Sequence, residues 1–282
     1  MDDTKTTKIG ALVRMGVFLF LGIISQILFF WLFQPLGLLI SAALGTFAAA
    51  GVTTALTLRM FERSSLSSIG LRWHPAALRH VGLGLGIGIG SALLVTILPF
   101  LMRIAEFVPK ADTPFNAPSL IFVSLLLVFG VMGEEILFRG YGFQILAGTF
   151  GRYQVLLPVA VLFAAAHASN ANSSPLALLN TFLWGVALGY AFLRSGDLWL
   201  PIGVHFGWNV TLPLVGVELS GFTMGLTGYS LHWKIGDLWS GGAYGPEGGL
   251  VTSLVIPVVF FALYRAQVVT QKPYLMRFEE EE

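Results

Sequence analysis

Two adjacent carboxylates and an arginine lie inside a long apolar stretch of this 282-residue chain. Residues 133–140 read Gly-Glu-Glu-Ile-Leu-Phe-Arg-Gly and come shortly after the apolar run 120–129. Ionised side chains are costly at membrane depth unless they are paired or face a polar cavity, so they mark a candidate functional site. On a helix, Glu135 and Arg139 stand at i and i+4, which predicts an ion pair. Glu134 has no such partner and is left for chemistry.

Two histidine clusters follow on later apolar segments. Phe163 and His167 are four residues apart, and so are His205 and Asn209, so each pair shares one face of a helix. A carboxylate with an imidazole can activate water as a general base, and an imidazole with an amide can donate to a developing oxyanion. Three such clusters on separate segments indicate one shared site. A purely structural network of hydrogen bonds between helices is the alternative.

The same side chains could instead ligate a divalent metal such as zinc, through His167, His205 and one glutamate. We favour the metal-free chemistry because Asn209, one turn from His205, is better suited to donate a hydrogen bond than to bind zinc. No cofactor is therefore predicted, with zinc kept as the alternative. The sequence holds no cysteine, which excludes a thiol nucleophile, thiolate metal sites and disulfides.

The composition is typical of a polytopic membrane protein. The chain is 55% hydrophobic and 11% charged, whereas soluble domains carry about 25% charged residues. A membrane span needs about 20 apolar residues, so we predict an all-α bundle of about eight transmembrane helices. The predicted spans are 12–33, 37–58, 81–102, 118–138 (its helix continuing to about 148), 153–168, 175–193, 198–216 and 249–268.

The predicted organisation has three parts: N-terminal spans and a connector at the membrane interface over 1–117, the polar clusters over 118–216, and an external loop, last span and acidic tail over 217–282. Most basic residues fall on the side of the N-terminus, and only Arg103, Lys110 and Lys234 fall on the other. The positive-inside rule then predicts cytoplasmic N- and C-termini. The expected partners are the lipid bilayer and a membrane-anchored protein or peptide. A net charge of +1 gives no reason to expect nucleic acid.

Three further expectations concern the connections between the polar clusters. In the third span, Gly82, Gly86 and Gly90 recur every four residues and predict a smooth stripe for close helix packing. Residues 104–117 are expected to form an external loop, and the glycine-rich segment 217–248 a loose connector rather than a lid. The acidic residues 279–282 are expected to be solvated and disordered.

The three polar clusters together resemble the motifs of the CPBP intramembrane proteases, which include type II CAAX prenyl proteases and bacteriocin-immunity relatives. The motifs are Glu134-Glu135-x-x-x-Arg139, Phe163-x-x-x-His167 and His205-x-x-x-Asn209, in the family's order. They span roughly residues 120–215. Each motif is weak alone, and the three together are specific. The signatures of zinc, serine and aspartate intramembrane proteases (His-Glu-x-x-His, Gly-x-Ser-Gly and Gly-x-Gly-Asp) are absent from the sequence.

The resemblance implies an eight-span glutamate endopeptidase in a prokaryotic plasma membrane. It assigns water activation to Glu134 with His167. It assigns orientation of the site to Glu135 and Arg139. His205 and Asn209 would hold the oxyanion. The substrate would be a membrane-associated protein, possibly a prenylated CAAX protein. A non-catalytic membrane scaffold or immunity-type binding protein is the alternative function, as is a metal-dependent form of the same protease.

Overall fold

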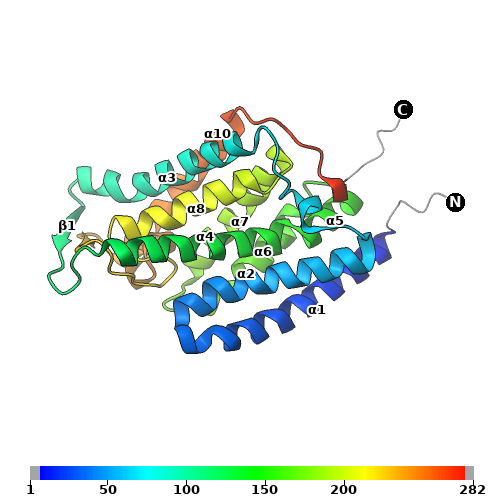
Figure 1. The fold of residues 1–282 in the computed structure, drawn as a ribbon. Helices are drawn as coiled ribbons and strands as arrows, with labels where there is room; N and C mark the ends of the chain where they lie inside the picture. Colours follow the sequence, from blue (N-terminus) through cyan, green and yellow to red (C-terminus); the bar gives the residue numbers. More distant parts are fainter. Residues whose placement is uncertain (1–6, 277–282) are drawn as a thin grey trace.

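The computed structural model describes residues 7–276, which form a bundle of α-helices (Figure 1). The predicted acidic tail, 279–282, lies outside the described residues. Helices α1 (Lys8–Phe33) and α2 (Leu38–Thr57) form an antiparallel hairpin along one side of the bundle. The remaining long helices are α3 (Ala77–Leu101), α4 (Ala117–Arg139), α5 (Tyr141–Phe150), α6 (Leu156–Ala166), α7 (Pro175–Ser195), α8 (Trp199–Leu214) and α10 (Leu250–Arg265), with the short α9 (Asp237–Ser240) before the last.

All eight predicted spans are helical, but they differ in length. Five segments of the described chain are long and apolar enough to cross a membrane: Lys8–Leu36, Leu38–Glu62, Ala77–Leu101, Ala117–Phe150 and Pro175–Ser195. Helices α6 and α10 are apolar but shorter, and α8 has 16 residues. The chain is therefore an all-α integral membrane protein, and the count of eight transmembrane helices stays a prediction.

Helices α4 and α7 begin where the sequence offers strong start signals. The Asn116 side chain accepts a hydrogen bond from the Ser119 amide at 2.9 Å, and Ser174 Oγ accepts one from the Ala177 amide at 3.1 Å. A proline follows each cap in the first helical turn, where its missing N–H leaves no hydrogen bond unmade. These caps fix where the two helices enter the bundle.

The helix that contains the two glutamates ends earlier than the sequence predicts. A continuous helix to about 148 was expected, but α4 stops at Arg139 and α5 begins at Tyr141. Gly140 has ψ −122°, outside the helical region. The Gln144 side chain donates to the Arg139 carbonyl at 3.0 Å and to the Ile69 carbonyl at 2.8 Å. The break therefore leaves the Arg139 carbonyl satisfied, because a side chain replaces the missing backbone donor.

The glycines of α3 make a close contact with α8, but not through the predicted stripe. An added Cβ at Gly82, Gly86 or Gly90 would meet no atom within 4 Å. At Gly84 it would lie 2.7 Å from the Val204 amide nitrogen, and at Gly88 2.8 Å from that of Trp208. The predicted close packing of α3 against another helix is present, but it uses the face with Gly84 and Gly88 instead of the face with Gly82, Gly86 and Gly90.

The opposing face of α8 is also made of glycine. A Cβ at Gly203 would lie 2.6 Å from the Val81 carbonyl oxygen, and one at Gly207 3.0 Å from the Ile89 amide nitrogen. Glycine faces glycine across this contact, so the two backbones meet with no side chain between them. This contact fixes the position of α8 against α3.

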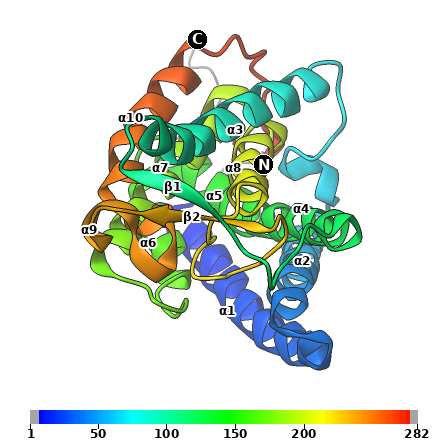
Figure 2. The same cartoon turned by 90° about the vertical axis from the view of Figure 1, so that its left-hand side faces the viewer.

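A two-stranded antiparallel sheet covers the end of the bundle opposite the start of α1 (Figure 2). Strand β1 (Ala105–Pro109) pairs with β2 (Tyr229–Trp233), with Phe107 opposite Leu231. The expected loops 104–117 and 217–248 are thus joined to each other. The Lys234 ammonium lies 2.6 Å from Glu106 and holds the pKa of that carboxyl below its usual value through a hydrogen bond and charge attraction. The sheet anchors the segment 217–248 across the end of the bundle.

Candidate active site

The structure brings the predicted site residues together from separate helices. Glu134 and Glu135 lie on α4, His167 follows the last residue of α6, and His205 and Asn209 lie one turn apart on α8. His167 and His205 both lie close to Glu134. The Nε2 atoms of these histidines lie 3.8 Å and 3.7 Å from Glu134 Oε2.

Glu135 is the centre of a buried network. Arg139 Nη1 donates to Glu135 Oε1 at 3.2 Å, which confirms the predicted i,i+4 ion pair, and both residues have no exposed surface. His205 Nδ1 donates to the same oxygen at 2.8 Å. Arg139 Nη2 also donates to the Gly185 carbonyl on α7 at 3.1 Å. Glu135 therefore links α4 to α8, and Arg139 links α4 to α7.

Glu134 differs from its neighbour because no described residue donates a hydrogen bond to it, whereas Glu135 Oε1 accepts from Arg139 and His205. Its Oε2 atom is buried and makes no hydrogen bond to any described residue, although a quarter of the side chain is exposed. The separations from the two imidazoles exceed the usual hydrogen-bond length, so these are ion-pair contacts that a water molecule beside each pair could bridge. Glu134 is therefore available to bind a water molecule, whereas Glu135 Oε1 is held by Arg139 and His205.

The hydrogen bonds on the far side of each imidazole define what its Nε2 can do. His167 Nδ1 donates to the Phe163 carbonyl at 2.8 Å, and His205 Nδ1 donates to Glu135. In the neutral ring, each Nε2 then carries a lone pair on the side of Glu134. The Phe163 ring packs 4.7 Å from the His167 ring and 4.5 Å from the Arg139 guanidinium, so it orients both groups.

A cavity of about 440 Å³ surrounds these atoms. Asn209 lines it together with Glu134, His167 and His205, and the Asn209 amide makes no hydrogen bond to another described residue. Apolar side chains from α1, α2 and α4 form much of the remaining wall, including Phe30, Leu39 and Leu127. The cavity combines a few convergent polar groups with an apolar wall, as substrate pockets do.

The segment 217–248 forms part of this cavity, so our expectation of a loose connector was wrong. Leu219, Ser220, Phe222, Met224 and Glu247 all line it. Glu247 Oε1 accepts from the Trp208 indole at 2.9 Å, and its Oε2 accepts from the Ser220 amide at 2.5 Å and from Ser220 Oγ at 2.8 Å. Glu247 therefore holds the segment against α8, next to Asn209.

Sequence reasoning did not identify Glu247 as a cavity residue. It lies in the Gly-Pro-Glu-Gly-Gly tract directly before α10, which carries the composition of a turn. An acidic side chain immediately before an apolar helix was the available signal. Nearby, burial raises the pKa of Tyr244 to about 12, so its phenol stays protonated at neutral pH.

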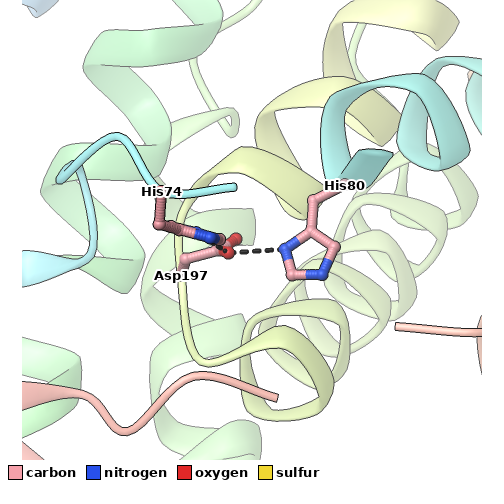
Figure 3. A group of neighbouring side chains, drawn as sticks. All are labelled: His74, His80 and Asp197. Carbon is pink, nitrogen blue, oxygen red and sulfur yellow. Dashed lines mark hydrogen bonds and ion pairs between the residues drawn. The ribbon is translucent and has the colours of Figure 1, made fainter. Parts of the chain in front are cut away.

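A second polar cluster lies outside the cavity, at the start of α8 (Figure 3). Asp197 Oδ2 accepts from His74 Nε2 at 2.8 Å and from His80 Nδ1 at 2.5 Å. Its other oxygen accepts from the amides of Trp199 and Leu200 in the first turn of α8. A single buried carboxylate therefore joins the connector before α3, the first turns of α3 and the first turn of α8.

This cluster has residue types that bind metals, but the hydrogen bonds around His80 favour a different role. The Val269 amide donates to His80 Nε2 at 3.1 Å, so that nitrogen carries the lone pair and the proton resides on Nδ1. A metal bound at Nδ1 would need the opposite tautomer and would set two N–H groups against each other. The three residues fit a hydrogen-bonded junction better than a metal site.

Residues 116–211 match the family model described as type II CAAX prenyl endopeptidase Rce1-like. This match covers all the residues that converge on the cavity from α4, α6 and α8. The segment is therefore similar to the Rce1-like family. The description of that family names an endopeptidase.

One curated relative is similar to part of this chain. An uncharacterized 24.3 kDa protein of Escherichia coli is 31% identical over 143 residues, which cover 50% of this chain and 61% of that protein. No solved structure matches the chain. The Rce1-like assignment therefore rests on the segment that carries the polar residues.

Proposed function

We propose that this protein is an intramembrane endopeptidase that uses Glu134 to activate water. The observation that carries the proposal is the Oε2 atom of Glu134, which accepts no hydrogen bond from a described residue and lies 3.8 Å and 3.7 Å from two imidazole nitrogens inside a partly apolar cavity. A water molecule beside such a pair, away from the line that joins the two atoms, can contact both the carboxylate oxygen and the imidazole nitrogen. The family match of residues 116–211 supports the same class of reaction.

The proposed reaction begins with a water molecule held by Glu134 and His167. Glu134 takes a proton as the water oxygen attacks the carbonyl carbon of the peptide, and the carbonyl oxygen becomes negatively charged. The Asn209 amide and a protonated His205 Nε2 donate to that oxygen. Glu134 then returns the proton to the departing amine as the C–N bond breaks. Glu135 supports this step by orienting His205 through a hydrogen bond to Nδ1, and Arg139 holds Glu135 as its ion-pair partner.

We predict that Glu134→Gln abolishes peptide cleavage while the protein stays folded. The amide keeps the shape of the side chain but cannot accept the proton, so the rate should fall by at least roughly 100-fold. His167→Ala should have a comparable effect. The measurement uses purified protein in liposomes and a panel of membrane-proximal and prenylated peptides, with product analysis by mass spectrometry.

Cleavage that survives both substitutions would rule out this assignment. A folded wild-type protein that binds such peptides without cleaving any of them would support the alternative, a scaffold or immunity-type binding protein. Phe129→Leu provides a matched control, since Phe129 is an exposed α4 residue that lies outside the cavity lining.

A metal-dependent form of the reaction is the second candidate, and one observation favours it. Both imidazoles use Nδ1 to hold an oxygen acceptor, which leaves each Nε2 lone pair directed at Glu134, as in histidines that bind zinc. Glu134, His167 and His205 would hold the ion, which would polarise the attacked carbonyl. We rank the metal-free form first because Asn209 lines the cavity with a free amide.

Chelation separates the two forms of the mechanism. We expect activity to persist within about two-fold after dialysis against a strong chelator, because Glu134 and His167 suffice to activate water. Metal content of the purified protein should be well below one ion per chain by mass spectrometry. Loss of activity in chelator with recovery on adding Zn²⁺ would establish the metal-dependent form.

We further propose that both termini face the cytoplasm, as the distribution of basic residues predicts. The substrate would be a membrane-anchored protein of a prokaryotic plasma membrane. Prenylated CAAX proteins are one candidate class, suggested by the description of the matching family.

A further inference from the structure

A short loop, residues 220–225, forms part of the wall of the cavity. Ser220, Phe222 and Met224 line the cavity, and Thr223 between the last two is exposed. Alternate side chains of the loop therefore turn toward the cavity. The match to the Rce1-like family ends at residue 211, so the loop lies outside the matched segment.

Both ends of this loop are fixed, whereas its middle is held weakly. Leu219 and Leu226, which flank the loop, are each 4% exposed and pack in the apolar core. From Thr223 to Gly225, no backbone group is hydrogen-bonded to another described residue. A segment with few hydrogen bonds between two buried residues is one that opens locally at low cost.

The loop starts in a conformation that needs support. Ser220 has φ +49°, in the left-handed region that residues other than glycine seldom adopt, and Gly221 follows with φ +85°. Glu247 Oε2 accepts from the Ser220 amide at 2.5 Å and from its hydroxyl at 2.8 Å. The Gly221 amide donates to the Tyr244 carbonyl at 2.9 Å. These three hydrogen bonds hold the strained start of the loop, so the strain is released when they break.

The carboxylate that holds the loop is itself fixed to the bundle. Glu247 Oε1 accepts from the Trp208 indole on α8 at 2.9 Å. The Asn180 side chain on α7 donates to the Glu247 carbonyl at 2.8 Å, and Thr252 Oγ1 on α10 donates to the Pro246 carbonyl at 2.6 Å. Glu247 is therefore a rigid anchor, and the loop is the part that can move.

The loop also lies close to two connections between helices. A Cβ added at Gly221 would lie 3.1 Å from the Ala171 carbonyl carbon, in the connection between α6 and α7. A Cβ added at Gly225 would lie 3.5 Å from the Thr113 Cβ, in the segment before α4. The loop therefore reaches from one connection to the other and closes the cavity between them.

We infer that residues 220–225 are a lid on the cavity, which Glu247 holds closed and which opens to admit the substrate. The inference rests on the proposed function and adds a step before the reaction. In the closed state, Phe222 and Met224 complete the apolar wall and limit the entry of water, as closing loops do in other active sites. Opening breaks the hydrogen bonds from Ser220 to Glu247 and lets Ser220 leave the left-handed region.

A disulfide that locks the lid tests this inference. The chain has no cysteine of its own, and the 3.5 Å between Thr113 Cβ and a Cβ at Gly225 suits a disulfide. We expect the oxidised Thr113→Cys/Gly225→Cys protein in liposomes to cleave peptides with at least ten-fold lower kcat/KM than the same protein after reduction. Each single substitution is the control and should not respond to oxidation. Equal rates before and after reduction would overturn the inference.

The failure of the catalytic proposal would look different. If no peptide is cleaved in either state, the proposed function fails and the rate of peptide association, followed by stopped-flow fluorescence, decides about the lid. Association with the oxidised protein should then be at least ten-fold slower than with the reduced protein, and equal association rates would contradict a lid.

The role of Glu247 is tested without any substrate. Spin labels on Thr223→Cys in the lid and on Leu56→Cys, an exposed position in the last turn of α2, report the position of the lid by pulsed electron paramagnetic resonance. We expect one distance in the otherwise unchanged protein and a second, longer distance when Glu247→Gln is added.

Two further variants complete this measurement. Ser220→Ala removes one of the two hydrogen bonds to Glu247 and should populate the longer distance less than Glu247→Gln does. Glu218→Gln is the matched control, because Glu218 lies in the same segment but not among the lining residues, and it should leave the single distance unchanged. A single, unchanged distance in both Glu247→Gln and Ser220→Ala would overturn the inference, even where the disulfide does not form.

Discussion

Glu135→Gln is expected to destabilise the folded protein by about 3–5 kcal/mol, because it leaves Arg139 as a buried charge without its counter-ion. Both residues have no exposed surface, and Glu135 Oε1 accepts from Arg139 and from His205. Activity should be lost as well, since His205 loses the acceptor that orients it. Unfolding in one detergent, followed by heating or by denaturant, measures the first effect.

The adjacent Glu134→Gln is the matched comparison. Glu134 makes no hydrogen bond to a described residue, so this change should alter the free energy of unfolding by less than about 1 kcal/mol. A destabilised Glu134→Gln protein beside a stable, inactive Glu135→Gln protein would reverse the roles proposed for the two carboxylates.

Gly88→Ala is expected to destabilise the protein by about 3 kcal/mol, at the upper end of the range for overpacked sites. The added methyl group would meet the Val204 carbonyl oxygen and the Trp208 amide, and backbone atoms in a packed helix cannot move aside as a flexible side chain can. Because α8 carries His205 and Asn209, a shift of this helix should also lower kcat.

Gly86→Ala is the control on the same helix, since an added Cβ there would meet no atom within 4 Å. It should be neutral or slightly stabilising, because alanine favours helix more than glycine does. The two variants are compared by thermal unfolding and by cleavage rate. Equal behaviour of the two would show that the α3–α8 contact is looser than the structure indicates.

The pairings at i,i+4 could be predicted from the sequence because they depend only on the geometry of one helix. Glu135 with Arg139 needed no knowledge of the rest of the fold. The convergence of His167 and His205 on Glu134 was predicted only as an expectation that polar groups at membrane depth gather. Their distances depend on how α4, α6 and α8 pack, which no local spacing determines.

The features that were missed depend on partners distant in the chain. Alternate residues from Gly82 to Gly90 are glycine, so α3 has two smooth stripes, and the sequence of α3 alone does not distinguish them. Gly203 and Gly207 on α8 select the second stripe. Strands β1 and β2 are five residues each and far apart in sequence, so neither has a strong signal of its own. Glu247 is likewise held at the cavity wall by hydrogen bonds from Trp208 and Ser220, which lie 39 and 27 residues away in the sequence.

The Asp197 junction has a consequence for the order in which the chain is assembled. Three of its contacts, with His74, His80 and the first turn of α8, can form once α8 has been synthesised. The Val269 amide that binds the far side of His80 is made roughly 70 residues later, on the order of seconds at usual rates of synthesis. His80 then has a buried nitrogen without a donor during that interval. The chain segment that follows α10 therefore completes this junction, and the start of the helix that bears His205 reaches its final packing only after Val269 has been synthesised.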